Sequence, residues 1–305
     1  MYHGIINIKK EAGYTSHDVV AKLRGILKQK KIGHTGTLDP DAVGVLPVCL
    51  GSGTKLCDML TGEDKEYEAV LCLGVRTDTQ DMSGRILEER EVNVTEGQVV
   101  ETIESFLGSY EQVPPMYSAL KVNGRKLYEL ARAGREVERK ARAVQIREIE
   151  IEKIKLPCVW FRVVCSKGTY IRTLCDDIGY KLGCGGTMEK LVRTRVGRFR
   201  IEDAVTLSEV EILRDTDKIT CAIIKVDDMF PQLKALTIPD TMQKMVSNGN
   251  CIPVKELVQE KLQQADYKFN QEEQIRVYDR AGTFYGIYAY RGNVDMLWPV
   301  KMFLQ

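Results

Sequence analysis

The stretch Ile32–Gly51 joins a polar, glycine-rich loop to an apolar run, and this pairing constrains the fold most strongly. The loop half contains three residues that interrupt helices and strands: Gly33, Gly36 and Pro40. The apolar half, Val45–Leu50, predicts a buried strand with Pro47 near its start or at a sheet edge. A loop anchored in this way suits a catalytic Asp39, although most Asp-Pro pairs serve only as turns.

Apolar and alternating runs predict five further strands in the first two thirds of the chain: His3–Lys9, Glu66–Val75, Ala143–Lys155, Cys158–Cys165 and Lys190–Arg200. Glu66–Val75 has polar residues only at its start, so we expect it to be central in its sheet. The alternation in Ala143–Lys155 slips between Ile146 and Ile149, which indicates a β-bulge. Cys158–Cys165 is its expected antiparallel partner. Lys190–Arg200 carries five basic residues and no acid, which favours a nearby phosphate backbone.

Capping residues and apolar stripes predict the helices. Thr15 or Ser16 can cap a helix with Val19, Val20, Leu23 and Leu27 on one face, and Thr95 with Gln98 forms a capping box for another. A third helix has Ile171, Leu174, Cys175, Ile178 and Leu182 on its apolar face. If that helix starts early, Tyr170 and Arg172 flank the stripe from opposite sides and share no face.

The segment from about residue 111 to 142 is unusually basic. Between Lys121 and Arg142 it has eight Lys or Arg residues against three Glu. It also holds tyrosines, which suits contact with nucleic acid, although a solvated insertion explains the charge equally well. From about Lys234 the character changes to a small, mostly β module of about 70 residues, the size of an accessory domain.

Composition excludes several classes of protein. A length of 305 residues favours two domains, and the net charge of +1 identifies no partner. The nine cysteines form no C-x-x-C pair and only three histidines occur, so we expect no metal site and no disulfide framework. No apolar run is long enough for a membrane helix and no secretory signal is evident. Reduced thiols and a cytoplasmic location are therefore expected.

Four motifs occur in register along residues 1–230 and together resemble the TruB family of tRNA pseudouridine synthases: Gly33–Pro40 (GHTGTLDP), Lys65–Glu68 (KEYE), Pro114–Gly124 (PPMYSALKVNG) and Ser166–Arg172 (SKGTYIR). The resemblance implies an α+β fold with a catalytic domain, residues 1–232, around a long mixed and mainly antiparallel sheet. It implies a thumb-like insertion at about 111–142 and a PUA-like C-terminal domain, residues 233–305. It further implies isomerisation of uridine 55 in the T-loop of tRNA, without cofactor or metal.

The resemblance also assigns roles to residues. Asp39 is implied as the catalytic carboxylate, and Arg172 is expected to keep it ionised by lowering its pKa. Tyr67 is implied to stack on the flipped base and to assist proton transfer, while Tyr170 and Leu191 line the base pocket. His34 is implied to hold the extruded loop of the RNA.

Basic residues are expected to contact the RNA backbone: Lys121, Arg125, Lys126 and Arg132 in the thumb-like insertion, and Arg193, Arg195 and Arg198 in the basic strand. Asp41, beside the catalytic loop, is interpreted as a turn or cap residue.

Two alternatives are kept. The chain could serve as a tRNA-folding chaperone or RNA-binding protein, or it could carry out the same chemistry on another RNA. The expected partner is the T-arm of tRNA, and the expected state is a monomer.

Overall fold

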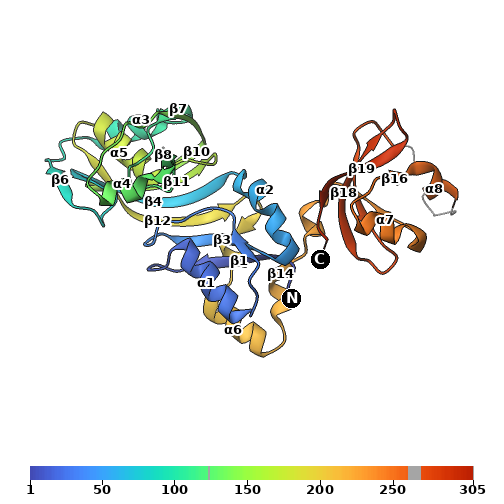
Figure 1. Ribbon diagram of the computed structural model, residues 1–305. Helices are drawn as coiled ribbons and strands as arrows, with labels where there is room; N and C mark the ends of the chain where they lie inside the picture. The colour runs from blue at the N-terminus through green and yellow to red at the C-terminus, as the bar shows by residue number, and fades with distance from the viewer. Residues whose placement is uncertain (123, 260–268, 305) are drawn as a thin grey trace.

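The computed structural model describes residues 1–122, 124–259 and 269–304, arranged as a large α+β part and a smaller strand-rich part (Figure 1). The large part is built on one long sheet with the strand order β14-β1-β3-β12-β4-β11-β10-β7, to which β2 and β13 are added. Its strands are β1 (Gly4–Lys10), β2 (Ile32–His34), β3 (Val43–Leu50), β4 (Lys65–Leu73), β7 (Gly108–Gln112), β10 (Arg142–Lys155), β11 (Cys158–Cys165), β12 (Gly186–Val196), β13 (Phe199–Arg200) and β14 (Ile223–Ile224).

Within this sheet only β3 and β12 run parallel, so the expected long, mainly antiparallel mixed sheet is confirmed. β4 lies between β11 and β12, as its apolar sequence predicted. β10 pairs with β11, and their register shifts between Ile146 and Glu148, which confirms the predicted bulge. The basic strand starts earlier than expected, at Gly186, and turns back at Gly197 to form β13.

The prediction that Pro47 lies near the start of its strand or at a sheet edge is wrong, because Pro47 is in the middle of β3 and β3 has neighbours on both sides. One neighbour is β1. On the other side β12 pairs only with Val43 and Gly44, and β2 pairs only with Val48–Leu50. Pro47 falls between these two pairings, where a missing N–H interrupts no ladder.

The helices of the large part are α1 (Ser16–Ile26), α2 (Cys57–Thr61), α3 (Glu96–Glu104), α4 (Leu127–Arg132), α5 (Ile171–Lys181) and α6 (Leu207–Asp215). The capping boxes of Thr15 with Asp18 and of Thr95 with Gln98 begin α1 and α3. Two small hairpins project from the sheet: β5 (Val75–Thr77) with β6 (Ile86–Glu89), and β8 (Lys121–Val122) with β9 (Arg125–Lys126). The second hairpin and α4 lie within the basic insertion at about 111–142.

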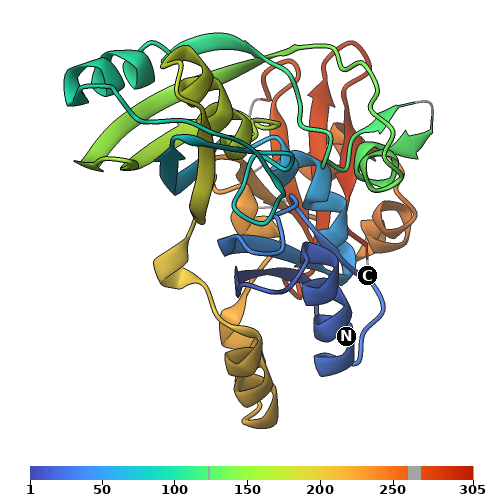
Figure 2. The same cartoon turned by 90° about the vertical axis from the view of Figure 1, so that its left-hand side faces the viewer.

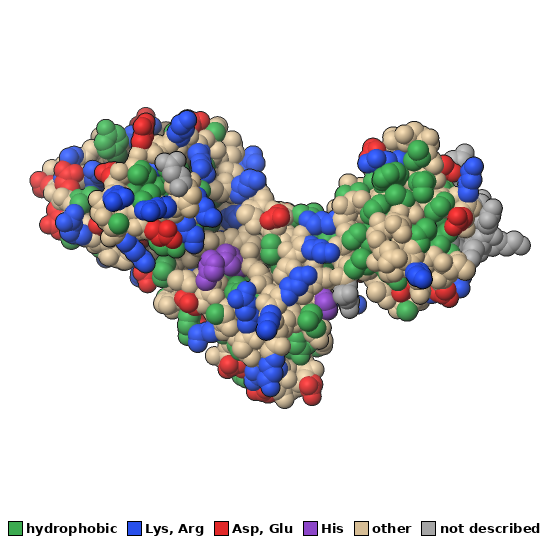
Figure 3. All heavy atoms as spheres, in the orientation of Figure 1, with side chains coloured by type: hydrophobic (Ala, Val, Ile, Leu, Met, Phe, Trp, Pro, Cys, Tyr) green, Lys and Arg blue, Asp and Glu red, His purple; other side chains and the backbone are tan. Residues whose placement is uncertain are grey.

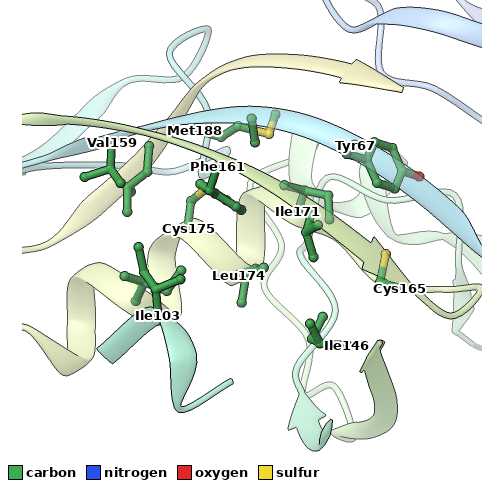
Figure 4. Close-up of a cluster of buried hydrophobic side chains, with 14 of the residues drawn as sticks. Tyr67, Ile103, Ile146, Val159, Phe161, Cys165, Ile171, Leu174, Cys175 and Met188 are labelled. Carbon is green, nitrogen blue, oxygen red and sulfur yellow. The ribbon is translucent and has the colours of Figure 1, made fainter. Parts of the chain in front are cut away.

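A core between the sheet and helices α3 and α5 supports the end of β4. It includes Ile103, Phe161, Leu174 and Met188. Figure 4 shows Tyr67 at one end of this cluster, with its oxygen directed away from the other labelled side chains. The core therefore fixes the ring of Tyr67 and leaves the hydroxyl group at its margin.

The C-terminal part has a five-stranded sheet with the order β15-β17-β18-β19-β16. Its elements are β15 (Lys234–Thr237), α7 (Gln243–Ser247), β16 (Ile252–Pro253), α8 (Val254–Gln259), β17 (Gln274–Tyr278), β18 (Phe284–Arg291) and β19 (Met296–Met302). A second view shows this sheet behind the large part (Figure 2). Ile287 and Phe303 share an apolar cluster with Leu56, and Lys55 Nζ donates to the Met302 carbonyl at 2.8 Å.

Candidate active site

Asp39 lies in the loop between β2 and β3, and buried groups fix the backbone on both sides of it. The N–H of Leu38 donates to Ser16 Oγ at 2.9 Å, and Ser16 is fully buried. Beyond Asp39, the ammonium group of Lys10 donates to the carbonyls of Pro40 (2.8 Å) and Ala42 (2.7 Å). The loop is therefore held from α1 and from β1, and Asp39 has little freedom to move.

Lys10 is a fully buried charged residue that the sequence did not single out. Burial lowers the pKa of Lys10 to about 8, while the carboxylates of Asp39 and Asp41 act in the opposite direction. A buried ammonium group needs several acceptors, and here three backbone carbonyls supply them, the third from Glu11. Lys10 thus places a positive charge behind the Asp39 loop as well as fixing its shape.

Arg172 is the direct partner of Asp39. It lies in the first turn of α5 and its side chain is only 6% exposed. Its Nη2 atom is 3.1 Å from Asp39 Oδ1 and donates to the Tyr117 carbonyl at 2.7 Å. Its Nη1 atom lies 3.7 Å from Asp81 Oδ2. One guanidinium group therefore joins the Asp39 loop, the loop after β5 and the start of the basic insertion.

The surroundings of Asp39 have opposing effects on its pKa. Burial raises the pKa of Asp39, Arg172 lowers it, and Asp81 raises it again. The expected direction of the Arg172 contribution is confirmed, but burial outweighs it, so the pKa of Asp39 is raised overall. Arg172 and Lys10 are the two groups that favour the charged carboxylate.

Asp81 is the second residue that sequence reasoning missed. It lies in the polar loop between β5 and β6, within the sequence TDTQDMSG of Thr77–Gly84. Its Oδ1 atom accepts hydrogen bonds from Thr79 Oγ1 (2.7 Å) and from the Ser83 N–H (3.0 Å). These bonds hold the carboxylate so that Oδ2 faces Arg172.

Tyr170 is placed beside Arg172 by its backbone. It is the N-cap residue of α5 and contributes no side-chain cap. The side chain of Gln112, which is 1% exposed, pairs with both backbone groups: Tyr170 N–H donates to Oε1 at 2.8 Å, and Nε2 donates to Tyr170 O at 3.0 Å. The Arg172 guanidinium carbon lies 5.9 Å from the centre of the Tyr170 ring, so the two side chains meet. Tyr170 has an extended backbone and lies outside the helix, so the condition under which the two would share no face is not met.

Tyr67, Leu191 and His34 surround this centre from other strands. Tyr67 is on β4, and burial raises the pKa of its phenol while Arg193 opposes the shift. Leu191 is half-buried on β12 opposite Ala69. His34 ends β2 and its ring meets that of His17 edge to face at 5.2 Å. Burial and His17 lower the pKa of His34, so its ring favours the neutral form. In Figure 3, histidine side chains lie in a hollow bordered by Lys and Arg.

The predicted phosphate contact of Arg193 is wrong. Arg193 is 1% exposed and donates to three carbonyls of the loop and of β3: Val45 (2.7 Å), Thr37 (3.3 Å) and Gly36 (3.4 Å). Its role is to support the Asp39 loop from below. The basic strand β12 also needs no phosphate backbone to balance its charge, because Glu66 on β4 lies 3.2 Å from Arg195 and supplies a negative charge.

The other basic residues are more accessible. Arg198 is exposed and donates to the Asp228 carbonyl at 2.7 Å. Lys121, Arg125 and Arg132 are exposed, and Lys126 is half-buried. Lys126 and Arg132 both lie against the ring of Tyr128, at 5.4 and 5.5 Å from its centre. The insertion therefore presents a basic surface built around one aromatic ring.

Two family models match consecutive parts of the chain. TruB family pseudouridylate synthase (N terminal domain) matches residues 24–171, and tRNA pseudouridylate synthase B C-terminal domain matches residues 172–229. The chain belongs to the TruB family. As a TruB-family protein it is a pseudouridine synthase, an enzyme of the isomerase class.

Relatives of this TruB-family chain extend over its whole length. A tRNA pseudouridine synthase B from Lachnoclostridium phytofermentans is 50% identical, over 99% of this chain and 100% of the relative. One from Bacillus cytotoxicus is 40% identical, over 98% and 96%. A solved structure described as a Cbf5-Nop10-Gar1 complex superposes with a TM-score of 0.68 at 26% identity, over 99% of this chain and 85% of the other.

Residues 1–122, 124–259 and 269–304 contain no group of three or more His, Cys, Asp or Glu side chains arranged to hold a metal ion. No helix in the part of the chain that the structure describes is long and apolar enough to cross a membrane.

Proposed function

We propose that the chain converts uridine 55 in the T-loop of tRNA into pseudouridine, with Asp39 as the catalytic carboxylate and no cofactor. The observation that carries this proposal is the 3.1 Å ion pair between Asp39 and the buried Arg172, with Tyr170 beside it. Relatives named tRNA pseudouridine synthase B support the choice of tRNA as substrate. A cytoplasmic enzyme that acts as a monomer fits this substrate.

The reaction moves the C1′ atom of the ribose from N1 to C5 of the uracil. The bond to N1 breaks, the base rotates, a bond to C5 forms, and C5 loses a proton while N1 gains one. An ionised Asp39 can act as a nucleophile or as a base at the ribose. Because burial raises the pKa of Asp39, the positive charges of Arg172 and Lys10 are what keep it reactive near neutral pH.

The uridine must leave the stacked T-loop to reach Asp39. We assign Tyr67 to stack on the flipped uracil and to assist proton transfer at C5, since its ring is fixed by the core and its hydroxyl lies at the margin. Tyr170 and Leu191 would line the same pocket. His34, with its neutral ring, would support the extruded loop through packing and hydrogen bonding.

The basic insertion would grip the T-arm. Lys121, Arg125, Lys126 and Arg132 carry charges suited to phosphates, and Arg198 is exposed near the same sheet. Phosphate contacts position an RNA, whereas the flipped base specifies it. Arg195, which is already paired with Glu66, would contribute less than a free cation.

The test replaces Asp39 by Asn and measures pseudouridine formation on a T-arm stem-loop. We expect turnover to be lost, while the dissociation constant for RNA changes by less than about tenfold because phosphate contacts are untouched. The matched control is Asp41→Asn, which removes an exposed carboxylate two residues away and should leave turnover intact. Turnover in Asp39→Asn would reject the assignment.

A chaperone role is tested in the same experiment. If Asp39→Asn loses pseudouridine formation but still promotes tRNA folding, the two activities coexist in one protein. Mapping of pseudouridine in total RNA from a deletion strain distinguishes the substrates. If the pseudouridine that is missing from the deletion strain lies outside the T-loop, uridine 55 is not the substrate position.

A further inference from the structure

Two cysteines face each other across the centre of the long sheet. Cys72 on β4 lies directly opposite Cys158 on β11 in the antiparallel register. The Leu73 N–H donates to the Pro157 carbonyl at 2.9 Å, so the neighbouring pair is hydrogen-bonded. The two types of pair alternate along an antiparallel ladder, so Cys72 and Cys158 occupy a non-hydrogen-bonded position, where side chains approach most closely.

The spacing at such a position permits a disulfide. Opposite Cα atoms there are typically about 4.5 Å apart, and disulfides occur from about 4.4 Å upward. The Cys72 thiol donates to the Leu73 carbonyl at 3.8 Å and the Cys158 thiol donates to a Glu189 carboxylate oxygen at 3.7 Å, and each cysteine affects the pKa of the other. The strand pairing itself holds the two cysteines at a separation that a disulfide can span.

Both thiols can be reached by a small reagent. Cys72 and Cys158 are each partly exposed, and Cys158 is the more accessible of the two. A second close pair, Cys49 with Cys57, differs because Cys49 is fully buried. Side chains alternate along β4, so Cys72, five positions after Tyr67, lies on the opposite face of the sheet from the proposed base pocket.

We propose that Cys72 and Cys158 are an oxidation site that a low-molecular-weight disulfide converts into a cross-strand disulfide. The Cys158 thiolate attacks one sulfur of the small disulfide and expels its other half as a thiolate. The Cys72 thiolate then attacks the Cys158 sulfur and releases the second half. The protein loses two electrons and two protons, and the small disulfide becomes two thiols.

The reaction is slow near neutral pH. Burial, with Cys158 and Glu189, raises the pKa of Cys72 to about 11, and burial and Glu189 also raise the pKa of Cys158. Only the thiolate attacks, so the rate of closure rises with pH. The pair therefore stays reduced during short exposure at neutral pH and closes under alkaline or prolonged oxidation.

We expect the disulfide between Cys72 and Cys158 to change the unfolding temperature of the protein and to leave its turnover unchanged. The bond would enclose the whole basic insertion, because residues 111–142 lie between Cys72 and Cys158 in the chain. A covalent link across so long a loop restricts the unfolded chain strongly, so we expect the unfolding temperature to rise by about 5 °C or more. Turnover on the T-arm stem-loop should be unchanged, since the bond forms on the face away from Tyr67.

The experiment treats the full chain with oxidised glutathione at pH 7 and at pH 9, blocks the remaining thiols and maps peptides without reduction. We expect a peptide that links Cys72 to Cys158, forms faster at pH 9 and separates on reduction. In Cys72→Ser, Cys158 should instead retain bound glutathione. The control Cys221→Ser, at an exposed cysteine elsewhere, should form the link normally.

Two results would overturn the proposal. One is wild-type protein that carries glutathione on Cys158 at pH 9 without ever forming the link. The other is a link from either cysteine to a different partner. Both readings come from wild-type protein, so neither depends on the folding of a variant, and neither depends on the proposed RNA substrate.

Discussion

Replacing Asp81 by Asn is the sharpest test of the charge arrangement around Asp39. The substitution keeps an oxygen that can accept from Thr79 and Ser83, so the loop retains its shape. It removes the negative charge 3.7 Å from Arg172 Nη1. Arg172 would then be held only by Asp39 and by the Tyr117 carbonyl.

The size of the effect follows from the geometry. Two unit charges at this separation attract by on the order of 4 kcal/mol at an effective dielectric constant of about 20. Much of that is offset by desolvation, because the Arg172 and Asp81 side chains are only 6% and 18% exposed. A remaining loss of about 1.4 to 2.8 kcal/mol in positioning Arg172 corresponds to a fall in kcat of about 10- to 100-fold.

The pH dependence of kcat tests the same charge arrangement independently, because the direction in which its acid limb should move is known. The charge of Asp81 raises the pKa of Asp39, so its removal must lower that pKa. Asp39 then stays ionised to lower pH, and the acid limb of kcat should move to lower pH even as the plateau falls. Single-turnover rates on a T-arm stem-loop between pH 4 and pH 9, with RNA binding measured separately, follow both quantities.

Asp78→Asn is the control, because Asp78 lies in the same loop and accepts from the Arg85 N–H without contacting Arg172. It should leave both the plateau and the acid limb unchanged. An Asp81→Asn enzyme with a normal rate, or with an acid limb that moves to higher pH, would refute the reasoning.

Two further substitutions test the supports of the site. Gln112→Leu leaves the Tyr170 N–H without a partner and should cost about 1 to 3 kcal/mol of unfolding free energy in denaturant titrations, with a lower kcat and unchanged RNA binding. Equal kcat in Gln112→Leu and wild type would contradict this role. Substituting Arg125, Lys126 and Arg132 by Ala should weaken tRNA binding and reduce the slope of log Kd against log salt by about 2 to 3. Lys218→Ala, at an exposed position after α6, should leave the slope unchanged, and an unchanged slope in the triple variant would mean that the insertion does not contact phosphates.

Local features of the fold could be predicted because they depend on neighbouring residues. The capping box at Thr95 needs only the residue three positions later, and the cap of α1 at Thr15 or Ser16 needs only a hydroxyl before the apolar stripe. The bulge in β10 could be predicted because the alternation of apolar and polar residues within Ala143–Lys155 slips at that point. Pairing partners further apart, such as β3 with β12, leave no such local sign, and the position of Pro47 was misjudged for that reason.

The candidate site could be predicted only where the family motifs mark it. Lys10 and Arg193 are ordinary basic residues at strand positions, and nothing in their spacing separates them from solvated ones. Their function appears when the fold buries them beneath the Asp39 loop, where backbone carbonyls replace water as acceptors. A basic residue in a strand can therefore stabilise a loop from inside as readily as it can bind a phosphate outside.

The basic insertion is structurally part of the active site as well as a surface beside it. Tyr117, whose carbonyl accepts from Arg172 Nη2, belongs to the insertion, and the same nitrogen contacts Asp39. Gln112, at the start of the insertion, fixes the backbone of Tyr170. The segment that is expected to grip the RNA therefore also holds the arginine that sets the charge of Asp39. A displacement of the residues at the start of the insertion would move Arg172. RNA binding by the insertion and the reactivity of Asp39 are therefore coupled through the guanidinium group of Arg172.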